Sequence, residues 1–125
     1  MARVVQLIDD VVVHKFEVGD DEFTIGRHPE SDVVVDDAAA SSLHAKIVVQ
    51  SNEFFPQYDE FFLEDVQSTN GTYINGVRLV GRQRLRNNDV IRVAYNRFKF
   101  IDDMEEDLEK TVLMLEQCHF TSEPE

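Results

Sequence analysis

The sequence has few of the features of a secreted or membrane-spanning protein. It contains one cysteine, Cys118, so no disulfide framework can form within the chain. The N-terminus lacks the cationic start and apolar stretch of a signal peptide, so we expect a cytoplasmic protein. No run approaches the roughly 18 consecutive apolar residues that a membrane span requires, and we therefore expect no membrane partner.

Basic residues are also scarce. Twelve Lys and Arg stand against 25 Asp and Glu, which gives a formal net charge of -13. Residues 102–125 carry -8 of this charge and residues 1–101 carry -5. No basic stripe with interleaved aromatics is present, so we expect no nucleic-acid partner. A few converging arginines can still bind a phosphate, because surface charges are screened over about 8–10 Å.

Short β-branched or aromatic runs alternate with turn residues from Arg3 to Ile101. Their spacing of about 8–12 residues is typical of an all-β sandwich. We predict about 10–11 mostly antiparallel strands in one domain, residues 1–101. The strands that can be assigned are 4–8, 11–18, 22–26, 33–35, 45–50, 61–65, 72–74, 77–79, 90–93 and 97–101.

Two Asn-Gly pairs, Asn70-Gly71 and Asn75-Gly76, lie five residues apart between apolar runs. Asn-Gly favours the tight type I′ turn, so both pairs are predicted to be successive hairpin tips. The hydroxyls of Ser68, Thr69 and Thr72 surround the first pair. This segment indicates a loop-built site for a small oxyanion, such as a phosphate carried on another protein.

Residues 51–60 hold three aromatics, Phe54, Phe55 and Tyr58, and a proline that disfavours a central strand. We predict a loop insertion. One interpretation is that the aromatics fold back to cover the sandwich. The other is that they form an exposed apolar patch for a partner.

Residues 102–125 are predicted to form an acidic C-terminal helix or tail. Met104, Leu108, Val112 and Leu115 fall at helical spacing behind a cluster of acids. Such a helix would dock on the sandwich or self-associate with a copy of itself. Thr111 is either an ordinary helix residue or a kinase target that, once phosphorylated, binds its own or a neighbouring sandwich.

Several short motifs follow one another in a fixed order along residues 3–101. They are Gly26-Arg27, Asp32, Ser41-x-x-His44-Ala45, Asp65-x-x-Ser68-Thr69-Asn70-Gly71-Thr72, Asn75-Gly76 and Asn88-Asp89-x-Ile91. In this order they resemble the forkhead-associated (FHA) domain family, whose members are β-sandwiches that bind phosphothreonine peptides. The resemblance implies a phosphoprotein-binding adaptor in Ser/Thr kinase signalling.

The resemblance also assigns roles to residues on loops at one end of the sandwich. It places Arg27, Ser41, Thr69 and Asn70 on the phosphopeptide and gives Gly26, His44 and Gly71 supporting structural roles. The chemistry agrees, because the planar fork of Arg27 can meet two phosphate oxygens at once. The amide of Asn70 can both accept from and donate to a peptide backbone.

One position departs from the family pattern. The residue after Ser41 is often arginine in the family, and here it is Ser42, which we retain as a binding residue through its hydroxyl or backbone N–H. Either the affinity is then lower, or binding depends more strongly on Arg27. The arginines of the following segment either strengthen the positive field near the ligand or are solvated surface charges; they are Arg78, Arg82, Arg84 and Arg86.

Other readings of the sequence are weaker. Ser41, His44 and Asp65 could be named as a catalytic set, but no Gly-x-Ser-x-Gly nucleophile elbow is present, and we predict no enzyme. Cys118-His119 lacks the further ligands of a zinc site, so we expect no metal and no cofactor. The alternative function is a phosphate-independent interaction or dimerisation scaffold of the same fold, using the loop at 51–60 or the tail.

Overall fold

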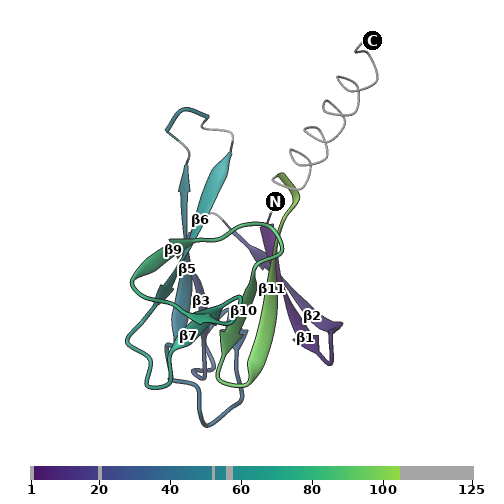
Figure 1. Ribbon diagram of the computed structural model, residues 1–125, viewed down its shortest axis with the longest axis vertical. Coiled ribbons are helices and arrows are strands. Elements are labelled where there is room, and N and C mark those ends of the chain that lie inside the picture. Colours follow the sequence, from purple (N-terminus) through teal and green to yellow (C-terminus); the bar gives the residue numbers. More distant parts are fainter. Residues whose placement is uncertain (1, 20, 52, 56–57, 105–125) are drawn as a thin grey trace, which may run out of the picture.

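The computed structural model describes residues 2–19, 21–51, 53–55 and 58–104, and these form two β-sheets packed face to face (Figure 1). The larger sheet has the order β2-β1-β11-β10-β7-β8. Its strands are β1 (Ala2–Ile8), β2 (Val11–Val18), β7 (Thr72–Ile74), β8 (Val77–Arg78), β10 (Val90–Val93) and β11 (Asn96–Asp102).

The smaller sheet has the order β4-β3-β5-β6-β9. Its strands are β3 (Phe23–Gly26), β4 (Val33–Val34), β5 (Ala45–Ser51), β6 (Asp59–Asp65) and β9 (Arg82–Arg84). Among the strand pairs of the described residues, β3 and β4 are parallel and the others are antiparallel. The predicted all-β sandwich of mostly antiparallel strands is confirmed.

The core lies between the two sheets and follows from alternation along the strands. In β11, Phe98 and Phe100 are fully buried, while their neighbours Arg97 and Lys99 point to the outer face and are exposed and half-buried, respectively. Phe100 meets Phe61 of the opposite sheet with ring centroids 5.2 Å apart. Burying a side chain of this size stabilises the fold by about 1.5–3 kcal/mol.

The sequence did not predict β9. Its residues, Arg82-Gln83-Arg84, are all polar and all exposed, so they carry no alternating pattern. The strand exists because it pairs with β6, with Leu63 opposite Gln83. The ten strands that were predicted are all present, with ends that differ by at most two residues.

One of the two predicted hairpin tips is wrong. Asn75 and Gly76 have φ angles of 50° and 83° and join β7 to β8, as a type I′ turn requires. Asn70-Gly71 instead lies on a connection between β6 and β7, which belong to different sheets. Gly71 has a φ of 86°, but Asn70 is not among the described residues with positive φ. The chain must change sheets here, so a two-residue hairpin cannot form.

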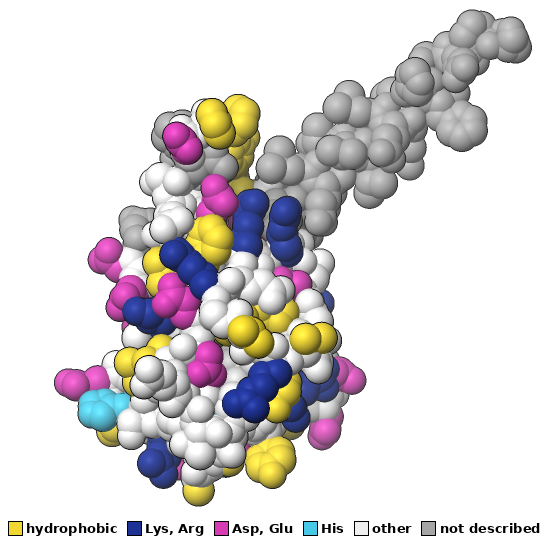
Figure 2. Space-filling view, turned by 60° about the vertical axis from the view of Figure 1, so that its left-hand side comes forward, with side chains coloured by type: hydrophobic (Ala, Val, Ile, Leu, Met, Phe, Trp, Pro, Cys, Tyr) yellow, Lys and Arg dark blue, Asp and Glu magenta, His cyan; other side chains and the backbone are white. Residues whose placement is uncertain are grey.

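Strands β5 and β6 form a hairpin that extends beyond the sandwich, and the described residues between them, 53–55 and 58, lie at its tip (Figure 1). Phe54 is 80% exposed and Phe55 is 56% exposed, so folding back over the sandwich was the wrong interpretation for these two. Tyr58 is half-buried and meets Phe55 edge-on, with ring centroids 6.2 Å apart. Hydrophobic side chains are visible at this tip in Figure 2.

The predicted tail helix lies outside the described residues from position 105 onward. Leu108, Thr111, Cys118 and His119 belong to this part of the chain. Within the described ranges, no helix is both long and apolar enough to cross a membrane.

Candidate functional site

Three loops meet at the lower end of the sandwich in Figure 1: β3–β4, β4–β5 and β6–β7. The strand register brings them together. Ala45, which begins β5, lies opposite Asp65, which ends β6, and it also lies opposite Ile25 of β3. The loops that carry the predicted site residues therefore leave three adjacent strands at the same end of the sheet.

Arg27 and Ser41 belong to different loops that are joined through their backbones. The amide of Arg27 donates to the carbonyl of Ser41 at 3.0 Å, and the amide of His28 donates to that of Ser42 at 3.0 Å. A Cβ at Gly26 would overlap the Ser42 carbonyl oxygen, so glycine is needed for this close approach. The Arg27 side chain is exposed and makes no ion pair with another described residue.

The third loop joins this pair through Thr69. Its backbone N–H donates to the hydroxyl oxygen of Ser41 at 3.2 Å. An oxygen that accepts this bond keeps its own O–H to donate. Ser41 is half-buried and Thr69 is exposed, so both hydroxyls lie where a ligand at this end can reach them.

His44 is fully buried and ties the β4–β5 loop to the β6–β7 loop. Its Nδ1 accepts from the backbone N–H of Ser41 at 3.0 Å. The proton of the neutral ring is therefore on Nε2, which donates to the carbonyl of Gly71 at 2.8 Å. A single ring thus sets the separation between Ser41 and the Asn70-Gly71 segment.

A carboxylate, Asp65, organises the β6–β7 loop from within. It accepts from the Ser68 amide at 2.8 Å, from the Ser68 hydroxyl at 2.5 Å and from the Thr72 hydroxyl at 2.7 Å. Burial on its own raises the pKa of Asp65, but these hydrogen bonds favour the ionised form and hold the pKa below its ordinary value of 3.8. The Ser68 hydroxyl also accepts from the Gly71 amide at 3.0 Å.

Ser68 and Thr72 were predicted from the sequence to be among the donors that surround the site. In the structure both hydroxyls serve Asp65 instead. The spacing Asp65-x-x-Ser68 was the available signal, since an aspartate that accepts from residues ahead of it is a common way to shape a turn.

Asn70 is exposed on this loop, and Gly71 next to it is buried. The Asn70 amide donates to the carbonyl of Ala39 at 2.8 Å, which fixes the side chain against the β4–β5 loop. A Cβ at Gly71 would lie 2.8 Å from Nε of Arg78, so the Arg78 side chain lies directly against this glycine. Ser42 is exposed and lines a shallow hollow of about 220 Å³ with His28 and Glu30.

The geometry does not support the hypothesis of a catalytic set of Ser41, His44 and Asp65. His44 contacts the backbone amide of Ser41, and both of its ring nitrogens have backbone partners. The carboxylate oxygens of Asp65 bind Ser68 and Thr72. These contacts do not form the relay from hydroxyl to imidazole to carboxylate that nucleophilic catalysis requires.

Two of the four arginines named from the sequence lie on β9, the edge strand next to β6, and have partners of their own. Arg82 lies 3.4 Å from Glu64 and stacks over the ring of Phe62 at 4.4 Å, and Arg84 lies 3.6 Å from Glu60. These two are surface charges rather than part of the site. Arg78 differs because of its contact with Gly71.

A β-sandwich that carries a polar site on three loops at one end is typical of a binding domain. The model of the FHA domain family matches residues 23–94, and the chain belongs to this family. The resemblance stated from the sequence motifs is thereby confirmed.

The chain is similar to two groups of curated proteins. It is 37% identical over 76 residues to the glycogen accumulation regulator GarA of Mycobacterium tuberculosis, and the matched region covers 61% of this chain and 42% of GarA. It is 40% identical over 78 residues to the oxoglutarate dehydrogenase inhibitor of Corynebacterium efficiens, covering 62% and 49%. The matched part thus spans about half the length of these relatives or less.

Solved structures show the same fold. The yeast Dun1 FHA domain, determined in complex with a doubly phosphorylated peptide, is 31% identical with a TM-score of 0.68, over 80% of this chain and 72% of that one. The FHA domain of the CT664 protein from Chlamydia trachomatis is 22% identical with a TM-score of 0.70, over 81% and 96%.

Proposed function

We propose that this protein is a phosphoprotein-binding adaptor that recognises phosphothreonine peptides in Ser/Thr kinase signalling. The observation that carries the proposal is the junction of Arg27, Ser41 and Thr69, where hydrogen bonds join three loops and leave an arginine side chain exposed without an ion-pair partner among the described residues. A dianionic phosphate is the ligand that such donors suit.

Each residue then has a defined task. Arg27 meets two phosphate oxygens, and the hydroxyls of Ser41, Ser42 and Thr69 donate to the phosphate. Each charge-assisted hydrogen bond contributes about 1.5–3 kcal/mol net, so three or four give roughly micromolar affinity. Asn70 donates to Ala39, and its amide oxygen accepts from the main chain of the bound peptide. Gly26, His44 and Gly71 hold the loops in place.

The names of the relatives support a regulatory role. GarA is called a regulator, and the corynebacterial proteins are called inhibitors of oxoglutarate dehydrogenase. Neither name describes catalysis by the relative itself. The protein would accordingly act by binding and not by catalysis. Its cytoplasmic location and the absence of a cofactor stay predictions from the sequence.

Calorimetric titration tests this function. The wild-type protein should bind a degenerate phosphothreonine peptide pool more tightly than the matching phosphoserine pool and should not bind the unphosphorylated pool. Arg27→Ala should remove most of the binding. Arg84→Ala, an exposed arginine on β9, is the matched control and should leave it unchanged. Equal heats for the phosphorylated and unphosphorylated pools would contradict the proposal.

A second candidate is a phosphate-independent scaffold, and one observation favours it. Phe54 and Phe55 are exposed at the tip of the β5–β6 hairpin, at the end of the molecule opposite to the three loops (Figure 1). Exposed aromatics of this kind mark protein contacts. Association that persists in Arg27→Ala but is lost in Phe54→Ser/Phe55→Ser would establish this function instead. Self-association through residues 102–125 stays a prediction.

A further inference from the structure

Arginines are concentrated on the outer face of the larger sheet, next to the candidate site. The strand register places Arg97 of β11 opposite Arg92 of β10, Arg92 opposite Tyr73 of β7, and Tyr73 opposite Arg78 of β8. Directly opposed residues share a face of the sheet, so these four side chains form one row across four strands. We call them the arginine row.

The row is exposed and only partly neutralised. The three arginines are exposed, and Tyr73 is half-buried. Arg92 stacks over Tyr73 with its guanidinium carbon 4.2 Å from the ring centroid, which fixes its direction. Arg97 lies 3.3 Å from Asp10, whose side chain is 80% exposed. Of the other described carboxylates near the row, Asp89 accepts from the Asn75 amide and the Arg86 backbone, and Asp37 accepts from the Tyr95 backbone and the Asn96 amide.

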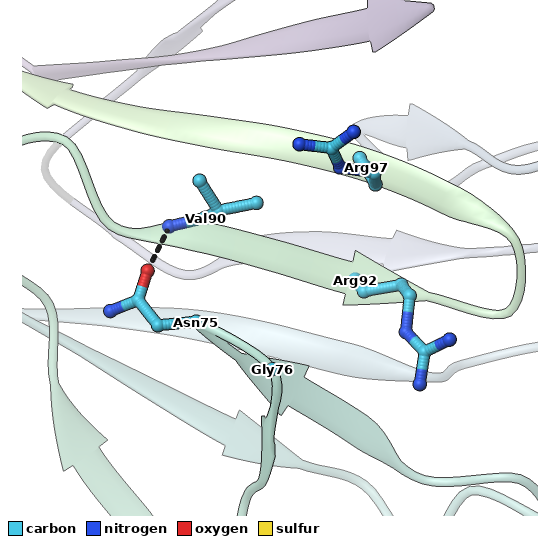
Figure 3. A pocket seen from close by; sticks show the side chains of 5 residues that line it. All are labelled: Asn75, Gly76, Val90, Arg92 and Arg97. Carbon is cyan, nitrogen blue, oxygen red and sulfur yellow. Dashed lines mark hydrogen bonds between the residues drawn. The ribbon is translucent and has the colours of Figure 1, made fainter. Parts of the chain in front are cut away.

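The pairing of Arg92 with Arg97 is unfavourable for the fold alone. Like charges directly opposite each other in an antiparallel pair destabilise a sheet. Figure 3 shows that the two guanidinium groups point in different directions from β10 and β11. Both side chains line a hollow of about 290 Å³ together with Asn75, Gly76 and Val90. An anionic ligand over this hollow would relieve the repulsion.

The row continues directly from the candidate phosphate site. Thr69 contacts Ser41, and two residues later Gly71 lies against the Arg78 side chain. A second hollow of about 200 Å³ connects the same regions, because Asn70 and Ala39 line it together with Tyr73 and Arg92. A peptide anchored at Ser41 and Thr69 can therefore reach the row without crossing the core.

The geometry points to an acidic flank of the phosphorylated peptide as the occupant of the arginine row. This inference rests on the proposed function and adds a sequence preference to it. From β8 to β11 the row spans three strand spacings, about 14 Å, which an extended chain covers in about four residues. In a protein of net charge -13, a local group of three arginines is the feature that an acidic peptide would recognise.

The test compares fluorescein-labelled phosphothreonine peptides by anisotropy. One peptide carries four glutamates before the phosphothreonine, one carries four after it, and matched peptides carry glutamines. Exposed ion pairs each change affinity by about two- to fivefold, so one glutamate peptide should bind about tenfold more tightly than its glutamine match.

Arg92→Gln/Arg97→Gln should remove this advantage and leave the affinity for the glutamine peptides within about twofold. Arg78 is kept because it contacts the loop of Asn70 and Gly71. The matched control is Arg82→Gln/Arg84→Gln, which removes the same charge and a similar arginine–aromatic stack from the other sheet. This control should retain the advantage.

Three outcomes would overturn the inference while leaving the proposed function intact. Glutamate and glutamine peptides could bind alike, the advantage could survive in Arg92→Gln/Arg97→Gln, or it could be lost equally in the control as a general charge effect. In each of these, phosphothreonine peptides still bind through Arg27. If no phosphopeptide binds the wild-type protein, both the proposed function and this inference fail.

Discussion

At the scale of single residues, the candidate site depends on residues other than those proposed to contact the phosphate. Gly26, His44 and Asp65 determine where Ser41, Thr69 and Asn70 lie. The sequence motifs predicted the exposed residues and the supporting roles of Gly26 and His44. They did not predict that Ser68 and Thr72 serve Asp65, because the direction of a hydroxyl is decided by the folded loop.

Gly26→Ala tests the close approach of the first two loops. The added Cβ would overlap the Ser42 carbonyl and push apart the backbone bonds that join Arg27 and His28 to the second loop. We expect a loss of stability of about 1–3 kcal/mol and a loss of phosphopeptide affinity. Gly19→Ala is the control, because its Cβ would meet no atom within 4 Å. Urea unfolding and calorimetry measure both effects, and equal behaviour of the two variants would contradict the argument.

His44→Ala tests the ring that joins the second and third loops. The variant loses two hydrogen bonds and leaves a cavity and unpaired backbone groups, so unfolding should require about 2–5 kcal/mol less free energy. His14→Ala, at an exposed position of β2, should change stability by less than about 0.5 kcal/mol. A His44→Ala protein as stable as His14→Ala would show that the ring does not hold the loops.

At the scale of elements, the β6–β7 loop shows what the sequence could and could not predict. Asn75-Gly76 forms the predicted hairpin because β7 and β8 are neighbours in one sheet. Asn70-Gly71 has the same two residue types but lies on a connection between the two sheets. Whether such a pair forms a hairpin depends on how distant strands pair. For the same reason β9, which is entirely polar, could not be predicted from alternation.

Asp65 gives this loop a dependence on pH. Its pKa is lower in the folded protein than its ordinary value of 3.8, so the ionised group stabilises the fold above that value. This stabilisation is lost as the pH falls from about 4 through the folded pKa. Asp65→Asn should therefore be less stable at pH 7 and should lose less stability on acidification. Urea midpoints from pH 2 to 7 measure this.

Asp59→Asn, at the exposed start of β6, is the control for Asp65→Asn and should follow the wild-type pH profile. Parallel profiles for Asp65→Asn and the wild-type protein would mean that the hydrogen bonds from Ser68 and Thr72 do not favour the ionised carboxylate.

At the scale of the whole molecule, charge and shape separate the candidate surfaces. The three loops lie at one end, the exposed Phe54 and Phe55 lie at the other, and the arginine row runs across the outer face of the larger sheet. On the face shown in Figure 2, basic side chains lie in small groups among acidic ones rather than in one stripe. A phosphopeptide and a second protein would therefore not compete for the same surface.

The fold class followed from the sequence because alternation and turn residues are local. The position of the candidate site was predicted from the family motifs, and phosphate binding there stays a prediction. The arginine row did not, because Arg78, Arg92 and Arg97 are neighbours only through strand register. Surfaces of this kind are assembled from distant parts of the chain and leave no local pattern in the sequence.

The most direct test of the central claim is a titration of the isotopically labelled protein with a phosphothreonine peptide, followed by amide chemical shifts. We predict the largest shifts at Arg27, Ser41, Ser42, Thr69 and Asn70, with none for the unphosphorylated peptide. The largest shifts at Phe54 and Phe55, or identical shifts with both peptides, would contradict a phosphate-reading site on the three loops.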